Sequence, residues 1–151
     1  MGRSLRNLRA VGSRRRWLIA EAMIWLLIAR LALVFLPFPR LARGLGDLAP
    51  PADPRVAAAG AATTPRAAEL AREVSWAVTR GAVHAPFRAV CLPRAMAARI
   101  MLKRRGVASA MHFGATVGAR EIDGHAWLDA AGVRVTGYPV AAALTEIACF
   151  V

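Results

Sequence analysis

The hydrophobic period of the chain changes at Gly106, and this change is the strongest constraint on its fold. Before Gly106 the apolar residues recur at helical spacing, and after it they alternate. The alternating segments are 107–117, 125–130, 133–140 and 145–151. Turn signals occur at Gly118 and at Ala131–Gly132. Helices therefore come first and short antiparallel strands second, which predicts an α+β fold for a 151-residue chain of one domain.

The N-terminal region contains a basic segment and a long apolar one. Residues 1–16 carry six arginines and no acid, and they predict a disordered arm. Residues 17–40 predict an apolar helix that is long enough to span a bilayer. Glu21 and Arg30 would each cost about 2.5–3.5 kcal/mol at the bilayer centre. We therefore expect a helix packed on a cytoplasmic domain, with peripheral membrane contact through Trp17–Leu36 as the open alternative.

Residues 41–65 are rich in Pro, Gly and Ala and predict a linker or long loop. Residues 66–151 then form the predicted core. Its first helix begins at Pro65, with Thr64 as the capping residue and Gly81 as a stop signal. The second runs from about Leu92 to Arg105 and ends at Gly106.

Composition excludes several functional classes. The net charge is +12, but the arginines are scattered along an Ala-rich chain, so no nucleic-acid partner is expected. The two cysteines, Cys91 and Cys149, form no disulfide framework and indicate free thiols in a reducing cytoplasm. The spacing shows no metal cluster, phosphate-binding loop or dinucleotide motif. We therefore expect neither a metal nor a cofactor.

Cys91 is the first candidate for chemistry. It opens a predicted helix, and Pro93 fits the first helical turn. Unpaired backbone N–H groups and the helix dipole favour a thiolate there, although a buried, inert thiol is the alternative. Of the three histidines, His84 has no evident geometric role and His112 is expected to be structural or exposed. His125, at the start of a strand, is the candidate base.

Strand alternation places His125, Trp127 and Asp129 on one face of the sheet. If this face contacts the Cys91 helix, His125 can activate the thiol. Trp127 either walls a substrate groove or is buried in the sheet. A hairpin turn at Ala131–Gly132 would bring the end of the next strand close to His125. The group that orients the imidazole should therefore lie there.

That hairpin pairs Ala130 with Val133, Trp127 with Thr136 and His125 with Tyr138, within one residue. No carboxylate lies between Thr136 and Tyr138. The available orienting groups are the Thr136 hydroxyl, a backbone carbonyl, or Asp129 on the histidine's own strand.

Three motifs together resemble a known family. They are "CLPRAMAARIMLKRRGV", "MHFGATVG" and "GHAWLDAAGVRVTG". The series resembles the B proteins of lasso-peptide biosynthesis, the transglutaminase-like leader peptidases related to the microcin J25-processing protein, from about Trp76 to the C-terminus. The resemblance implies a transglutaminase-like (papain-like) fold with Cys91 as nucleophile and His125 as base. The family's third residue is an aspartate, but Gly137 occupies its place in this chain.

The resemblance also implies a function. Such enzymes remove the leader from a ribosomally made precursor peptide, and an ATP-dependent cyclase then closes a macrolactam ring. No strand alternation occurs in residues 1–85, so the chain resembles the split type, which works with a separate leader-recognition protein. The rival hypotheses are a non-catalytic precursor-presenting protein, a small basic membrane-associated protein, and an acyl transferase with the same Cys/His chemistry.

Overall fold

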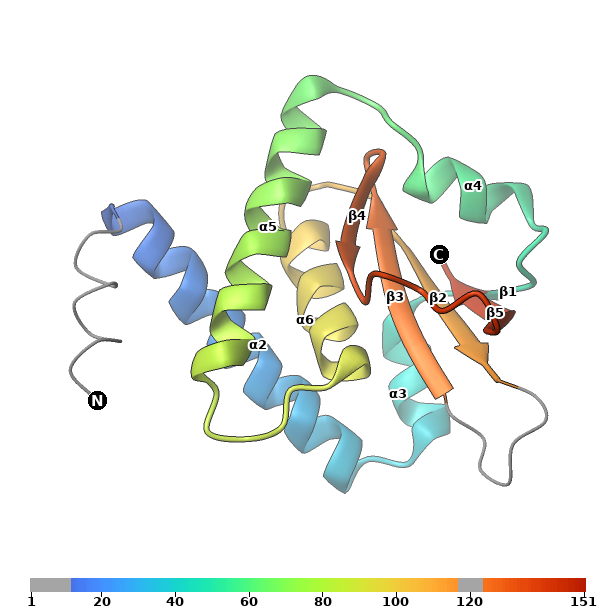
Figure 1. Ribbon diagram of the computed structural model, residues 1–151, viewed down its shortest axis with the longest axis horizontal. Coiled ribbons are helices and arrows are strands. Elements are labelled where there is room, and N and C mark those ends of the chain that lie inside the picture. Colours follow the sequence, from blue (N-terminus) through green and yellow to red (C-terminus); the bar gives the residue numbers. More distant parts are fainter. Residues whose placement is uncertain (1–11, 117–123) are drawn as a thin grey trace.

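The computed structural model describes residues 12–116 and 124–151, and it has the predicted α+β order (Figure 1). The helices are α2 (Ser13–Phe35), α3 (Phe38–Leu45), α4 (Pro54–Gly60), α5 (Pro65–His84) and α6 (Cys91–Lys103). The strands are β1 (Leu48–Ala49), β2 (Ala110–Ala115), β3 (Gly124–Ala130), β4 (Val133–Thr136) and β5 (Thr145–Phe150).

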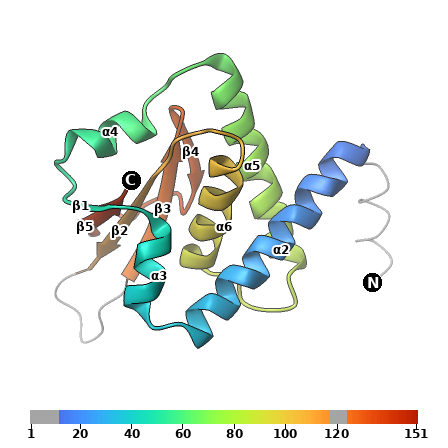
Figure 2. The ribbon, with the colours of Figure 1, turned by 180° about the vertical axis from the view of Figure 1, so that it is seen from behind.

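The strands form one antiparallel sheet in the order β1-β5-β2-β3-β4. Helices α5 and α6 cover one face of this sheet, and α2 crosses their outer side (Figure 2). The main core lies between these layers. Its fully buried side chains include Leu26 from α2, Val74 and Val78 from α5, Met101 from α6 and Leu128 from β3.

Helix α2 begins at Ser13, so the last residues of the predicted basic arm are helical, while residues 1–11 lie outside the described chain. Its acidic residue has a partner in the turn that follows α6: Glu21 pairs with Arg105 at 2.6 Å. The hydrogen bond from Arg105 lowers the pKa of Glu21, and this effect outweighs the opposing effect of burial. Arg30 is exposed to solvent. The charges of α2 therefore fit a helix packed on the domain.

The segment predicted as a linker contains α3, β1 and α4. The Asp53 side chain accepts a hydrogen bond from the Arg55 backbone N–H at 2.9 Å and caps α4. Val56 packs with Ala110 and Cys149 on the sheet face that α5 and α6 leave uncovered. Helix α4 has only seven residues, which is too short for periodicity to reveal. The linker prediction is therefore corrected.

Helix α5 starts as predicted, because the Thr64 hydroxyl accepts a hydrogen bond from the Ala67 N–H at 3.1 Å. It does not stop at Gly81. A Cβ at this glycine would lie 3.3 Å from that of Ala22, so Gly81 permits close packing against α2. Helix α6 ends at Lys103, and Gly106 (φ +70°) terminates the turn as predicted.

The β3–β4 hairpin turns at Ala131 and Gly132, whose φ angles are +50° and +75°. Ala130 pairs with Val133 as predicted, but Thr136 pairs with Leu128 instead of Trp127 because the register shifts next to Leu128. The register prediction holds within its stated one residue. The turn signal at Gly118 lies outside the described residues.

Candidate active site

The sheet separates the candidate residues from the helices. Ala126 and Leu128 face α6 and belong to the main core. His125, Trp127 and Asp129 lie on the opposite face, because side chains alternate along β3. This face therefore does not contact the Cys91 helix. Cys91 and His125 instead line one cavity at the end of the sheet where α6 and β3 both begin (Figure 1).

A cavity of about 810 Å³ lies at this end. Cys91 and His125 both line it, together with Gly137, Arg88 and Arg94. Cys91 is half-buried and is a free thiol. Among the described residues, no hydrogen bond joins Cys91 to His125. Such bonds are often long in the free enzyme and tighten only when substrate binds.

The imidazole of His125 is held by the backbone. Its Nε2 lies 2.6 Å from the carbonyl oxygen of Gly137. A carbonyl oxygen only accepts hydrogen bonds, so Nε2 carries the proton and Nδ1 is the basic nitrogen of the neutral ring. The ring also stacks on Trp127, with centroids 6.0 Å apart and planes at 22°. The orienting group in this structure is thus a backbone carbonyl, one of the three groups considered from the sequence.

Gly137 is required for this arrangement. Its φ of +83° is the left-handed conformation that side chains disfavour. A Cβ here would lie 2.7 Å from the Trp127 Cα and closer still to the Ala126 carbonyl oxygen. The family's aspartate would collide with the β3 backbone in this conformation. Gly137 therefore offers a backbone carbonyl at the place where the lasso-peptide B proteins, which the sequence resembles, have an aspartate.

The other two candidates for this role point elsewhere. Asp129 accepts a hydrogen bond from the Tyr138 hydroxyl at 2.6 Å, and its second oxygen lies 3.3 Å from His112 Nε2. The Thr136 hydroxyl is buried and makes no hydrogen bond within the described chain. Neither Asp129 nor Thr136 orients His125 here.

Trp127 is 8% exposed and does not line the Cys91 cavity. Its ring lies parallel to that of His112, with centroids 5.4 Å apart, and it also stacks with His125. Of the two roles weighed from the sequence, burial in the sheet matches the structure. The Trp127 ring packs against the imidazole of His125 and helps to hold it in place.

Two features near the start of α6 suit amide chemistry. The N-cap residue of α6 is Val90, whose side chain cannot accept a hydrogen bond. No side chain therefore caps the backbone N–H groups of Cys91 and Leu92. Uncapped N–H groups at a helix start can stabilise an oxyanion. The charged groups at the cavity are cationic: Arg88 is exposed, and Arg94 donates from Nε to the Ala89 carbonyl at 2.7 Å.

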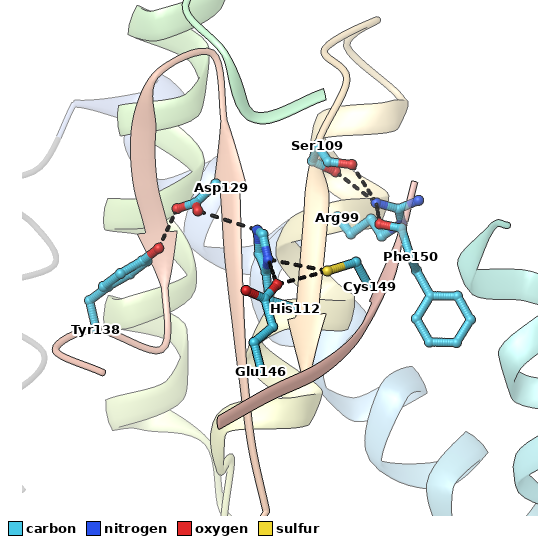
Figure 3. A network of polar contacts seen from close by, with 8 residues as sticks. All are labelled: Arg99, Ser109, His112, Asp129, Tyr138, Glu146, Cys149 and Phe150. Carbon is cyan, nitrogen blue, oxygen red and sulfur yellow. Dashed lines mark hydrogen bonds and ion pairs between the residues drawn. The ribbon is translucent and has the colours of Figure 1, made fainter. Parts of the chain in front are cut away.

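A second cysteine–histidine cluster lies on the same sheet face, about β2 and β5 (Figure 3). Cys149 Sγ is 3.4 Å from His112 Nδ1 and donates to Glu146 Oε1 at 2.8 Å. Glu146 Oε1 also contacts His112 Nδ1. His112 is therefore buried and structural, as one of its two sequence expectations had it.

The electrostatics of this cluster differ from those of a nucleophilic pair. Burial, the hydrogen bond to Glu146 and the negative charge of Glu146 raise the pKa of the Cys149 thiol to about 12. Burial alone would lower the pKa of His112. The nearby Asp129 carboxylate and the hydrogen bond to Glu146 outweigh it, so the pKa of His112 is raised. The Cys149 thiol is therefore held protonated, and the carboxylates around His112 favour its charged form.

The sequence pattern does not predict this cluster. Glu146 and Cys149 are three residues apart, and strict alternation would place them on opposite faces of β5. The register between β2 and β5 shifts at Gly114, which pairs with Glu146, while Phe113 pairs with Ala148. The extra residue, Ile147, turns Glu146 to the face of Cys149. The only signal was the motif Glu-x-x-Cys opposite a strand histidine.

Comparison with known families agrees with the fold. A model of the Transglutaminase-like superfamily matches residues 32–149. The chain therefore belongs to the transglutaminase-like superfamily. No curated protein and no solved structure matches the chain.

Proposed function

We propose that this chain is a cysteine peptidase that removes the leader peptide from a ribosomally made lasso-peptide precursor. A separate leader-binding protein would present the precursor, and an ATP-dependent cyclase would close the macrolactam ring. The observation that carries the peptidase proposal is the His125–Gly137 hydrogen bond of 2.6 Å, at a cavity that Cys91 also lines. The lasso precursor is supported by the motif series that begins at Cys91 and ends after His125.

The proposed reaction is amide hydrolysis through a thioester. His125 Nδ1 takes the thiol proton of Cys91, and the thiolate attacks the scissile carbonyl carbon. Backbone N–H groups of Cys91 and Leu92 stabilise the oxyanion, and His125 then protonates the leaving amine as the C–N bond breaks. Water, deprotonated by His125, hydrolyses the thioester and restores the thiol. The Gly137 carbonyl keeps Nε2 protonated throughout and stabilises the imidazolium.

The cavity charge suggests which peptides bind. Arg88 and Arg94 lie beside Cys91 and favour a precursor with acidic groups near its cleavage site. Raising the salt concentration should therefore increase KM more than it lowers kcat, because exposed charges are screened within about 10 Å at 0.1 M salt.

The decisive experiment replaces Cys91 with Ala and follows the precursor by mass spectrometry with the partner proteins present. The expected loss of cleavage is about a thousandfold or more, since the nucleophile is removed. Cys91→Ser, with a circular-dichroism spectrum and unfolding curve, verifies that the fold is intact. Unchanged cleavage in Cys91→Ala would favour a non-catalytic presenting protein. A product that keeps the acyl group on a new amine would show an acyl transferase.

A second proposal concerns location. Helix α2 is long and apolar enough to cross a membrane, and only 28% of its most apolar 18-residue window is buried. Its exposed apolar side chains include Trp17, Ile24 and Phe35. These support peripheral membrane contact of the cytoplasmic protein. Washing membranes with carbonate tests it, because a docked helix is released whereas a spanning helix stays.

A further inference from the structure

The second cysteine–histidine cluster has the composition of a transition-metal site. One ligand atom from each of His112, Glu146 and Cys149 lies within 4.8 Å of the other two. Imidazole nitrogen, thiolate sulfur and carboxylate oxygen together are the donors that Zn²⁺ takes in proteins. We propose that His112 Nδ1, Glu146 Oε1 and Cys149 Sγ bind one Zn²⁺ ion. This proposal is independent of the peptidase activity.

The distances between the three donor atoms are close to those expected around a bound Zn²⁺ ion. Donor atoms around tetrahedral Zn²⁺ lie about 3.2–3.6 Å apart, given bonds of about 2.0–2.3 Å. The distance of 3.4 Å between Cys149 Sγ and His112 Nδ1 already fits. Glu146 Oε1 lies closer, at 2.8 Å from Cys149 Sγ, and has to withdraw by less than about 1 Å. Its half-buried side chain, on a strand bulge, has the freedom to do so.

The groups around the donors also suit a metal. A histidine that binds a metal through one ring nitrogen usually donates from the other nitrogen to a carboxylate. His112 Nε2 lies 3.3 Å from Asp129, which in turn accepts from the Tyr138 hydroxyl at 2.6 Å (Figure 3). The ring of His112 is further fixed by its parallel stacking on Trp127. The imidazole is thus already oriented with Nδ1 toward the other two donors.

A way in for the ion is present as well. A cavity of about 490 Å³ is lined by His112, Asp129, Tyr138 and Glu146, among others. Cys149 is fully buried behind them. The cavity gives room for a water molecule as the fourth ligand. The two anionic donors, Cys149 and Glu146, balance the charge of the ion, which releases the thiol proton on binding.

The site would connect to the candidate active site. Tyr138 lines both cavities and directly follows Gly137, whose carbonyl holds His125. The ion would fix Asp129 through His112 and thereby fix Tyr138. We therefore expect the metal to be structural, because it ties β2 and β5 to the chain that follows β4.

The experiment uses the full-length chain, stripped with a chelator and titrated with Co²⁺ as a spectroscopic probe for Zn²⁺. The wild type should show a thiolate-to-cobalt charge-transfer band that saturates at one equivalent and disappears when Zn²⁺ is added. The two cysteines are a matched pair: Cys91→Ser should keep the band and Cys149→Ser should lose it. Absence of the band in the wild type would overturn the proposal, as would its loss in Cys91→Ser alone.

Because Cys149 is buried, a second pair of variants keeps the test decisive if Cys149→Ser does not fold. Glu146→Gln removes an anionic donor at a partly exposed position and should weaken Co²⁺ binding at least about tenfold. Asp129→Asn leaves all three donors and should weaken it about 10- to 100-fold while the band remains. Unchanged affinity in both folded variants would contradict the site.

Discussion

The two cysteine–histidine clusters share side-chain types but differ in burial and in what surrounds the imidazole. Cys91 is half-buried beside an open cavity, whereas Cys149 is fully buried. His125 has one nitrogen on a neutral carbonyl, and its other nitrogen is the basic one. Both nitrogens of His112 face carboxylates. A base needs an unprotonated nitrogen, so the first cluster suits nucleophilic chemistry, and the second suits a stable charge or a metal.

Trp127 lies between the two histidines and stacks with both. The sheet therefore supports both clusters with one side chain, on the face away from the main core. The difference between the clusters comes from the loops and strand ends. Gly137 brings a carbonyl to His125, and Asp129 and Glu146 bring charge to His112. The same sheet thus places two cysteine–histidine clusters in different environments.

Apart from replacement of Cys91, the substitution expected to lower the cleavage rate most is that of His125. Replacing it with Asn should lower the rate of precursor cleavage about 10²- to 10⁴-fold, because the general base is lost. His84→Asn is the matched control, since His84 ends α5 and does not line the cavity. Cleavage is followed by mass spectrometry at saturating precursor. Equal rates for both variants would contradict the role of His125.

A smaller effect is expected at Gly137. Gly137→Ala should destabilise the fold by about 1–3 kcal/mol, because alanine is strained at φ +83° and collides with the β3 backbone. Urea unfolding measures this loss. Gly137→Asp should lower cleavage as well, even though it introduces the aspartate of the lasso-peptide B proteins that the sequence resembles. A gain of activity in Gly137→Asp would show that a side-chain carboxylate can orient His125 here.

The smallest effect concerns pH and the second cluster. The pKa of His112 is raised above its ordinary value of 6.5 in the folded state. Its contribution to stability is therefore complete below about pH 6.5 and is lost as the pH rises through the folded pKa. With chelator present, the difference in unfolding free energy between wild type and His112→Gln should shrink with rising pH, by at most about 1.4 kcal/mol per unit. A difference that grows with pH would contradict the charged cluster.

Much of this architecture was predictable because it follows from local patterns. The change of period at Gly106 gives the α+β order, and Thr64 and Pro65 mark the start of α5. The turn at Ala131–Gly132 sets the hairpin. The short helix α4 and the continuation of α5 past Gly81 were missed, because length in one case and packing against α2 in the other override local signals.

The candidate site was predictable in part for a similar reason. Cys91 opens α6, as the position of Pro93 indicates. A backbone group has no sequence signature. The sequence could therefore offer a backbone carbonyl, such as that of Gly137, only as one of three candidates for the group that orients His125. The His112 cluster depends on the bulge at Ile147, and a one-residue irregularity reverses which face a strand residue occupies. The His112 cluster could be predicted only if the pairing between β2 and β5 were already known.

The central claim is that Cys91 is the reactive thiol and Cys149 is protected. The direct measurement is labelling of the native, metal-free protein with iodoacetamide, with the modified cysteine located by peptide mass spectrometry. Cys91 should react at least about a hundredfold faster than Cys149, because the thiolate is the reactive species and Cys149 is buried with a raised pKa. Comparable labelling rates at the two cysteines, or faster labelling of Cys149, would contradict it.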